Sequence, residues 1–201
     1  MIFLDSIAAY FGAMNHLELA ATLVGLVSVA LTVRQNIWCW PTGLVMVTLY
    51  IFIFKDAKLY SDMGLQVIYI FMQLYGWHYW LKGKNQGPAE IKTLSTVERA
   101  AWGAASAVGI VGLGYGVGHF TDAALPYWDA ATTVLSLVAQ WLLGRKVLEN
   151  WLVWIVVDVL AVGVYINRGL DLTAGLYGVF LLLAASGLWT WMKAWRREQL
   201  A

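Results

Sequence analysis

Charged side chains are scarce in this sequence. Only 12% of its 201 residues are Asp, Glu, Lys or Arg, whereas 61% are hydrophobic. A typical soluble domain has about 25% charged and roughly 45–50% apolar residues. A chain of this length buries only about 70% of its surface when it folds, so a water-soluble fold could not hide so many apolar side chains. The composition therefore excludes an ordinary soluble domain and predicts a protein that lipid covers.

Cysteine pairs, basic runs and the common catalytic signatures are also missing. The single cysteine, Cys39, excludes a disulfide framework and a CxxC metal pair. A net charge of +1 gives no support to a nucleic-acid partner. The sequence has no GxxxxGK[ST] phosphate loop, no GxSxG elbow and no HExxH zinc pair. We therefore predict no enzymatic activity, no cofactor and no bound metal.

Seven stretches are long and apolar enough to cross a bilayer, which requires about 20 residues per helix. The segment before them, residues 1–16, contains Asp5 but neither Lys nor Arg. It lacks the basic start of a signal peptide, and we expect it to form an interfacial helix. The seven expected spans are residues 17–34, 38–54, 64–82, 97–117, 126–144, 150–167 and 173–194.

Two halves of the chain resemble each other, which indicates an internal repeat. ELAATLVG (18–25) matches DAATTVLS (129–136), and GWHYW (76–80) matches GLWTW (187–191) in the same register; NIWCW (36–40) matches NWLVW (150–154) in a slightly shifted one. We therefore predict an all-α integral membrane protein with seven transmembrane helices in a 3+1+3 order. Two parallel three-helix bundles (17–82 and 126–195) flank a polar linker (83–96) and a connecting transmembrane helix (97–117).

Lys and Arg favour one side of the predicted membrane. Ten of them fall on the side of the linker and the C-terminus, against three on the other side. The positive-inside rule then places the C-terminus in the cytoplasm and the N-terminus outside. Ser95 lies three residues before Glu98 at the start of the connecting helix, which predicts an N-cap there.

Asp158 is the clearest candidate for a functional residue. It falls near the centre of the 150–167 span, where an ionisable group is costly. Asn150, Trp154 and Asp158 follow one another at intervals of four, so they share a helix face. The alternative is a carboxylate that only fixes helix packing through a hydrogen bond.

Two further patterns point to the same region. Gln66, Tyr69 and Gln73 share one face of the third span, either to contact a ligand or to join helices by hydrogen bonds. Asn36 and Trp40 repeat the NxxxW pattern of the second half. Two acidic residues, Glu18 and Asp129, start corresponding spans, where we interpret them as helix N-terminal charges.

Several motifs resemble those of the Pnu-type vitamin transporters. They are NIWCWPTG (36–43), LYSDMGLQ (59–66), YGWHYW (75–80), YWDAATTVLS (127–136) and ENWLVWIVVD (149–158). The resemblance implies a fold like that of the SWEET sugar carriers, and a homotrimer in the bacterial inner membrane. It also implies facilitated diffusion of nicotinamide riboside for NAD biosynthesis, with a cytoplasmic kinase trapping the substrate. Trp154, Asp158 and either Gln66 or Gln73 are then expected at the substrate.

The residues are chemically suited to that substrate. Nicotinamide riboside is a flat pyridinium cation, which tryptophan faces attract at roughly 0.5–2 kcal/mol each, and its carboxamide can pair with Gln. Thiamine is also a flat cation, so another vitamin is an alternative. Proton coupling through Asp158 remains open. A lipid-modifying enzyme would need a cluster of carboxylates or histidines facing one membrane surface, and the sequence indicates none. A non-transporting scaffold or sensor is the remaining alternative.

Overall fold

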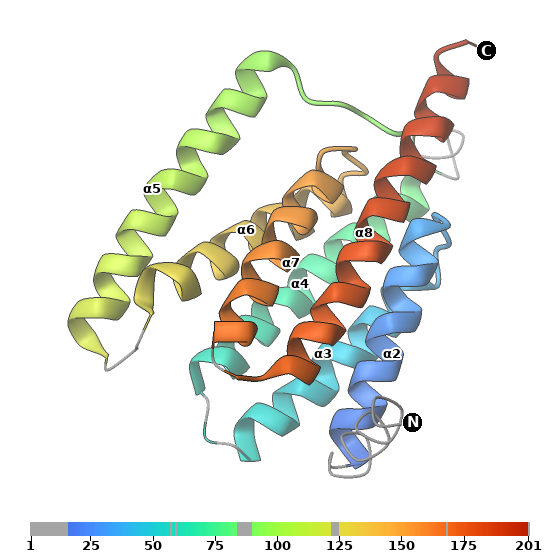
Figure 1. The fold of residues 1–201 in the computed structure, drawn as a ribbon. Coiled ribbons are helices and arrows are strands. Elements are labelled where there is room, and N and C mark those ends of the chain that lie inside the picture. Colours follow the sequence, from blue (N-terminus) through green and yellow to red (C-terminus); the bar gives the residue numbers. More distant parts are fainter. Residues whose placement is uncertain are drawn as a thin grey trace.

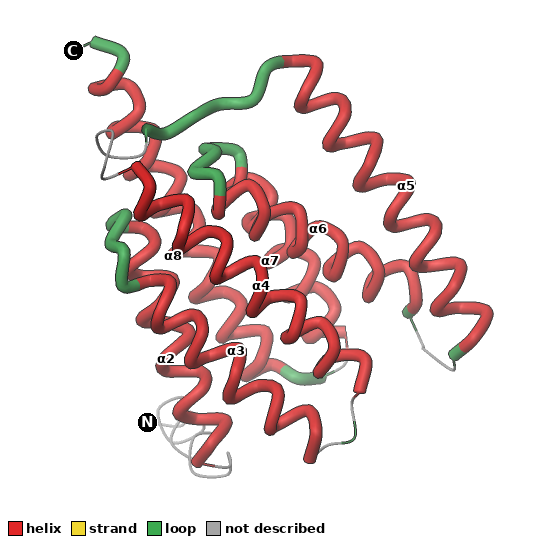
Figure 2. The backbone as a smooth tube through the Cα atoms, turned by 180° about the vertical axis from the view of Figure 1, so that it is seen from behind, coloured by secondary structure: helices red, strands yellow, loops and turns green. Residues whose placement is uncertain are grey.

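The computed structural model of the chain describes residues 16–56, 58, 60–83, 90–121, 125–167 and 169–200. Within them it has seven helices and one isolated β-bridge, which confirms the all-α prediction (Figures 1 and 2). The predicted interfacial helix falls almost wholly outside the described residues. The helices are α2 (His16–Val33), α3 (Cys39–Asp56), α4 (Tyr60–Gly83), α5 (Thr96–Phe120), α6 (Pro126–Gly144), α7 (Asn150–Asn167) and α8 (Asp171–Glu198).

Five of these helices are long and apolar enough to cross a membrane by length and composition: α2, α3, α5, α7 and the main part of α8. The other two, α4 and α6, are long enough but carry more polar side chains. Gln66, Tyr69 and Gln73 on α4, with Thr133 and Gln140 on α6, line an internal cavity. Part of the lower hydropathy of α4 and α6 therefore comes from the faces that they turn toward the cavity.

The repeat is visible in the backbone. Its two halves correspond residue by residue when Glu18 is paired with Asp129. In this register α3 and α7 correspond from their first residue to their last. The left-handed residues also form such pairs, since Gln35 (φ 53°) corresponds to Lys146 (φ 58°) and Lys58 (φ 60°) to Gly169 (φ 69°). The first bundle consists of α2, α3 and α4, and the second consists of α6, α7 and α8. They meet where α4 packs on α6 and α2 packs on α8, two contacts that the repeat makes equivalent.

The same register corrects one sequence alignment. The motif NxxxW paired Trp40 with Trp154, but the structure pairs Trp40 with Trp151. The backbone amide of Trp40 donates to Ile37, and that of Trp151 donates to Leu148. The predicted motif match was wrong because tryptophans occur both at 151 and at 154, and only the first starts its helix as Trp40 does.

Helix α5 connects the two bundles. Its predicted N-cap is confirmed: Ser95 and Glu98 form a reciprocal capping box. The helix packs on α6, where Gly109 lies against Val134 and Gly114 against Tyr127. Figure 1 shows α5 inclined away from the rest of the bundle, with its N-terminal end well separated from α6. Small residues therefore bring α5 close to α6 at one end only.

The segment before α5 lies across the ends of α6, α7 and α8. Its Lys92 amide donates to the Lys146 carbonyl (3.0 Å), and its carbonyl accepts from the Leu148 amide (2.8 Å). The Glu149 carboxylate accepts from the Leu94 amide and pairs with Arg99 at 2.8 Å. These contacts hold the linker against the loop between α6 and α7, on the side of the molecule where α8 ends.

Candidate functional site

A cavity of about 890 Å³ lies between the two bundles. All six helices of the bundles contribute to its wall, and α5 contributes none of the described lining residues. Sites for small ligands usually have about 300–1,000 Å³ and a mostly apolar wall with a few polar groups. The cavity therefore has the size and the position of a ligand site at a repeat interface.

Carboxylates dominate the charge of this cavity. Glu18, Asp62 and Asp129 lie in the first turns of α2, α4 and α6, at one end of the bundle. Asp158 lies deeper, on α7. Among the lining residues that the structure describes there is no Lys, Arg or His. A wall with four acidic groups and no cationic one makes this cavity electrostatically suited to a positively charged ligand.

Asp158 is almost completely buried, with 5% of its surface exposed. In the described part of the chain no side chain or amide donates a hydrogen bond to its carboxylate, and no cation pairs with it. A buried carboxylate without a partner is costly. A positive charge or a hydroxyl donor placed beside this carboxylate would lower that cost.

The two halves differ at the residues that face the middle of the cavity. In the first half, Gly43 lies directly against Gln73, and a Cβ at Gly43 would clash with the Gln73 amide. The equivalent pair in the second half is Trp154 and Ala184, so the large and small residues are exchanged. Gln73, Trp154 and Ala184 all line the cavity. Each pair combines a large side chain with a small one, but the first half presents the Gln73 amide to the cavity and the second half presents the Trp154 indole ring.

Aromatic residues close the cavity at the end of the bundle opposite to Glu18. Trp40 and Trp151 are 1% and 2% exposed, and they pack edge-on against Trp80 and Trp191 at 5.3 and 5.5 Å between ring centroids. Trp80 Nε1 donates to the Leu143 carbonyl of the second half. Trp191 Nε1 donates to the Thr32 carbonyl of the first half. We call Trp40, Trp80, Trp151 and Trp191 the aromatic floor.

The linker and a buried lysine complete this floor. Ile91 is buried among its tryptophans. The Lys146 ammonium lies 5.3 Å from the centre of the Trp80 ring. Burial lowers the pKa of Lys146, and Glu198 opposes that shift. The floor is therefore held by residues of both bundles and of the linker.

Three N–H donors at the floor end of the cavity have no acceptor within the described residues. They belong to Trp40 Nε1, Trp151 Nε1 and Gln140 Nε2, and all three residues line the cavity. Leaving a buried donor unpaired costs about 1–3 kcal/mol. Acceptor atoms of a ligand could satisfy them, so the deep end of the cavity is suited to a ligand with carbonyl or hydroxyl oxygens.

The structure brings together six of the eight residues that the sequence singled out. Asn36 does not line the cavity, because its side chain accepts from the Trp38 amide in the loop before α3. Asn150 is fully buried, and its amide donates to the Val147 carbonyl. Both asparagines shape the starts of helices rather than the cavity wall. The six that line the cavity are Trp40, Gln66, Tyr69, Gln73, Trp154 and Asp158.

Other lining residues did not stand out in the sequence. Trp151 reaches the floor end, and Tyr165 and Tyr177 stack at 5.2 Å near Asp158. Gln140 also reaches the floor end, but it belongs to a polar stripe that the sequence does show along this span, at Asp129, Thr133, Ser136 and Gln140. The register that pairs Glu18 with Asp129 would have identified Trp151 as the counterpart of Trp40. Glu18 and Asp129, interpreted as helix N-terminal charges, also line the cavity. No group of three His, Cys, Asp or Glu in the described ranges is arranged to hold a metal ion.

Comparison with known proteins extends these observations. A family model described as nicotinamide mononucleotide transporter matches residues 15–193. The nicotinamide riboside transporter PnuC of Escherichia coli (strain K12) is 28% identical over 211 residues, which cover 92% of this chain and 88% of the relative. The riboflavin/roseoflavin transporter RibM of Streptomyces davaonensis is 26% identical over 189 residues, which cover 90% and 86%.

A solved structure agrees with the sequence relatives. The crystal structure of the vitamin B3 transporter PnuC superposes with a TM-score of 0.76 at 27% identity, covering 96% of this chain and 88% of the other. The predicted fold and the resemblance to Pnu-type transporters are thereby confirmed. This multi-pass membrane protein belongs to the nicotinamide mononucleotide transporter family, whose members are vitamin transporters and not enzymes.

Proposed function

We propose that this protein carries nicotinamide riboside across a membrane by facilitated diffusion. The observation that supports this substrate most is the charge of the cavity, which has four carboxylates and no Lys, Arg or His among its described lining residues. Nicotinamide riboside is a pyridinium cation. Its phosphorylated form, nicotinamide mononucleotide, adds a phosphate that these carboxylates would repel. Riboflavin has no positive charge to match them.

The remaining lining residues have complementary chemistry. We propose that the pyridinium ring lies against Trp154 or the Tyr165–Tyr177 pair, where ring faces attract a cation. A glutamine, Gln66 or Gln73, can donate to and accept from the carboxamide. Asp158 can balance the charge or accept from ribose hydroxyls. This arrangement needs two different halves, which fits the exchange of Gly43 and Gln73 for Trp154 and Ala184.

The path of the substrate follows from the shape of the cavity. Its wall begins at the first turns of α2, α4 and α6 and ends at the aromatic floor. We propose that the protein lies in a bacterial inner membrane with its N-terminus outside the cell and its C-terminus in the cytoplasm, as the distribution of Lys and Arg predicts. With this orientation the aromatic floor lies on the cytoplasmic side of the cavity. We also propose that the protein forms a homotrimer. A cytoplasmic nicotinamide riboside kinase would then phosphorylate the substrate and trap it in the cell.

A binding panel tests the substrate. Isothermal titration calorimetry on the purified protein should detect nicotinamide riboside and give at least about tenfold weaker binding of nicotinamide mononucleotide, because a phosphate placed in an acidic cavity costs more than about 1.4 kcal/mol. Thiamine and riboflavin complete the panel. Binding of thiamine alone would refute the substrate but keep the transport class, and equal binding of the mononucleotide would refute the charge argument. Binding of no vitamin would favour a scaffold.

A further inference from the structure

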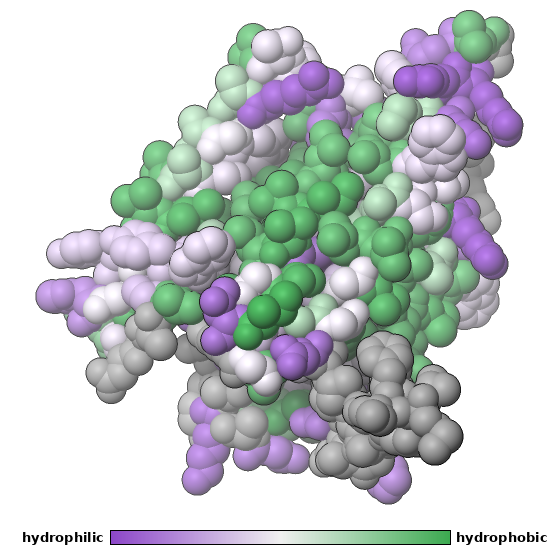
Figure 3. Space-filling model, viewed as in Figure 1, coloured by the Kyte–Doolittle hydropathy of each residue, from purple (hydrophilic) through white to green (hydrophobic). Residues whose placement is uncertain are grey.

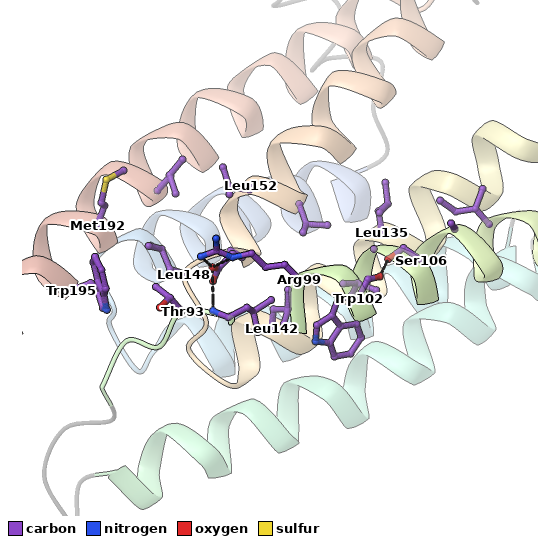
Figure 4. Close-up of a pocket in the computed structure, with 18 of the residues that line it drawn as sticks. Thr93, Arg99, Trp102, Ser106, Leu135, Leu142, Leu148, Leu152, Met192 and Trp195 are labelled. Atoms are coloured by element: carbon purple, nitrogen blue, oxygen red, sulfur yellow. Dashed lines mark hydrogen bonds and ion pairs between the residues drawn. The ribbon is translucent and has the colours of Figure 1, made fainter. Parts of the chain in front are cut away.

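A second cavity lies outside the bundles, in the angle between α5 and the second bundle. It has about 820 Å³, and its wall comes from α5, α6, α7 and α8 with Thr93 and Leu94 of the linker (Figure 4). No described residue lines both cavities. We call it the α5 groove. Figure 3 shows apolar residues gathered between α5 and α8 on this face, with hydrophilic residues toward the end of the molecule where the C-terminus lies.

The α5 groove is apolar along most of its length and cationic at one end. Ile110, Leu135 and Val138 line one end, and Arg99 and Arg196 line the other. Arg99 donates from Nε and Nη2 to the Glu149 carboxylate. The charge of Glu149 is therefore neutralised by Arg99. The Arg196 guanidinium group makes no hydrogen bond or ion pair with another described residue, and the side chain is exposed. The net charge at this end is positive.

The length of the groove matches one leaflet of a bilayer. Arg99 and Ile110 are about three helical turns apart on α5, which corresponds to roughly 16 Å along the helix axis. Half of the hydrocarbon core of a bilayer is about 15 Å. A phospholipid whose acyl chains end near Ile110 would therefore have its glycerophosphate at the level of Arg99 and Arg196.

We propose that the α5 groove binds an anionic phospholipid. Its acyl chains cover the apolar wall, and its phosphate pairs with Arg196 and with the Nη1 group of Arg99. Basic recesses between transmembrane helices on the cytoplasmic side are suited to anionic headgroups, and this end is the one that the excess of Lys and Arg assigns to the cytoplasm. The lipid would fill the space between α5 and the α7–α8 pair, whereas α5 itself packs mainly on α6.

The chain offers matched variants for a test. Arg196→Ala removes the charge that lines the groove, and Arg197→Ala removes a neighbouring charge that does not line it. Gly103 lines the groove and Gly116 does not, and at both positions a Cβ would meet open space. Gly103→Leu therefore adds an apolar side chain to the groove at a position with room for its Cβ, and Gly116→Leu is its control on the same helix.

Native mass spectrometry of the full-length protein measures the retained lipid. The protein is purified in detergent and mixed with equal amounts of phosphatidylglycerol and phosphatidylcholine that carry the same acyl chains. We expect retention of phosphatidylglycerol by the unmodified protein, by Arg197→Ala and by Gly116→Leu. Retention should fall about fivefold in Arg196→Ala and at least as much in Gly103→Leu. Circular dichroism checks that each variant is folded.

Three results would overturn the lipid site. Equal retention of the two lipids would show hydrocarbon contact without headgroup recognition. Unchanged retention in Arg196→Ala and Gly103→Leu would place the lipid elsewhere. A loss of oligomer in those two variants, without retained lipid in the unmodified protein, would assign the groove to a second copy of the chain. None of these outcomes depends on which vitamin is carried.

Discussion

Asp158→Asn is expected to weaken the binding of nicotinamide riboside by about 10-fold to 100-fold. The change is nearly isosteric and removes the only carboxylate that lies deep in the cavity among its described lining residues. A hydrogen bond or ion pair with a charged group contributes about 1.5–3 kcal/mol, and the low exposure of Asp158, 5%, limits screening by water and salt. Calorimetry of the purified variant measures the affinity directly.

The same variant separates ligand binding from packing. If Asp158 only fixed the helices, Asp158→Asn would lower the melting temperature of the ligand-free protein. If it faces the ligand, removing an unpaired buried charge should leave the melting temperature unchanged or raise it. Asp171→Asn, in the first turn of α8 and outside the cavity wall, is the matched control and should bind like the unmodified protein. Unchanged affinity in Asp158→Asn would remove this residue from the site.

Gly76→Ala and Gly187→Ala are each expected to destabilise the protein by about 1–3 kcal/mol, the usual range for overpacking. A Cβ at Gly76 would clash with the Trp40 ring, and one at Gly187 would lie 2.6 Å from the Trp151 ring. The two glycines are equivalent in the repeat, and each lets a tryptophan of the aromatic floor press against a helix backbone. Thermal unfolding in detergent, followed by circular dichroism, measures the loss.

Two other glycines, which correspond to each other in the repeat, provide the control variants. Gly64 on α4 corresponds to Gly175 on α8, and a Cβ at either position meets open space. Replacement of Gly by Ala inside a helix normally stabilises by roughly 0.5–1 kcal/mol, so Gly64→Ala and Gly175→Ala should not destabilise. If Gly76→Ala were as stable as Gly64→Ala, the tight packing of the aromatic floor would be refuted.

Most of the fold was predictable because each span follows from local composition. The expected ranges 126–144 and 150–167 coincide with α6 and α7. Helix α8 continues to Glu198, beyond its expected end at 194. Its last turn is polar, and hydropathy does not detect the part of a helix that extends out of the membrane. The linker contacts were not predictable, since Glu149 reaches Leu94 and Arg99 only through tertiary folding.

The site was predictable in part. Asp158 and Gln73 stood out because polar groups are unusual in apolar spans, and both line the cavity. Trp151 did not stand out, because the motif NxxxW directed attention to Trp154. Asn36 and Asn150 stood out for the same motif but serve local backbone hydrogen bonds. Periodicity reports which residues share a helix face, but the partner helix decides which face lines the cavity.

Uptake of labelled nicotinamide riboside into proteoliposomes tests the central claim most directly. With the purified protein in the membrane, the substrate should equilibrate across it at a rate that saturates, with and without a pH gradient. Liposomes that contain Asp158→Asn should be much slower at low substrate concentration. Absence of uptake by a folded protein that binds the substrate would contradict transport and favour a sensor. Accumulation above equilibrium that requires a proton gradient would contradict facilitated diffusion.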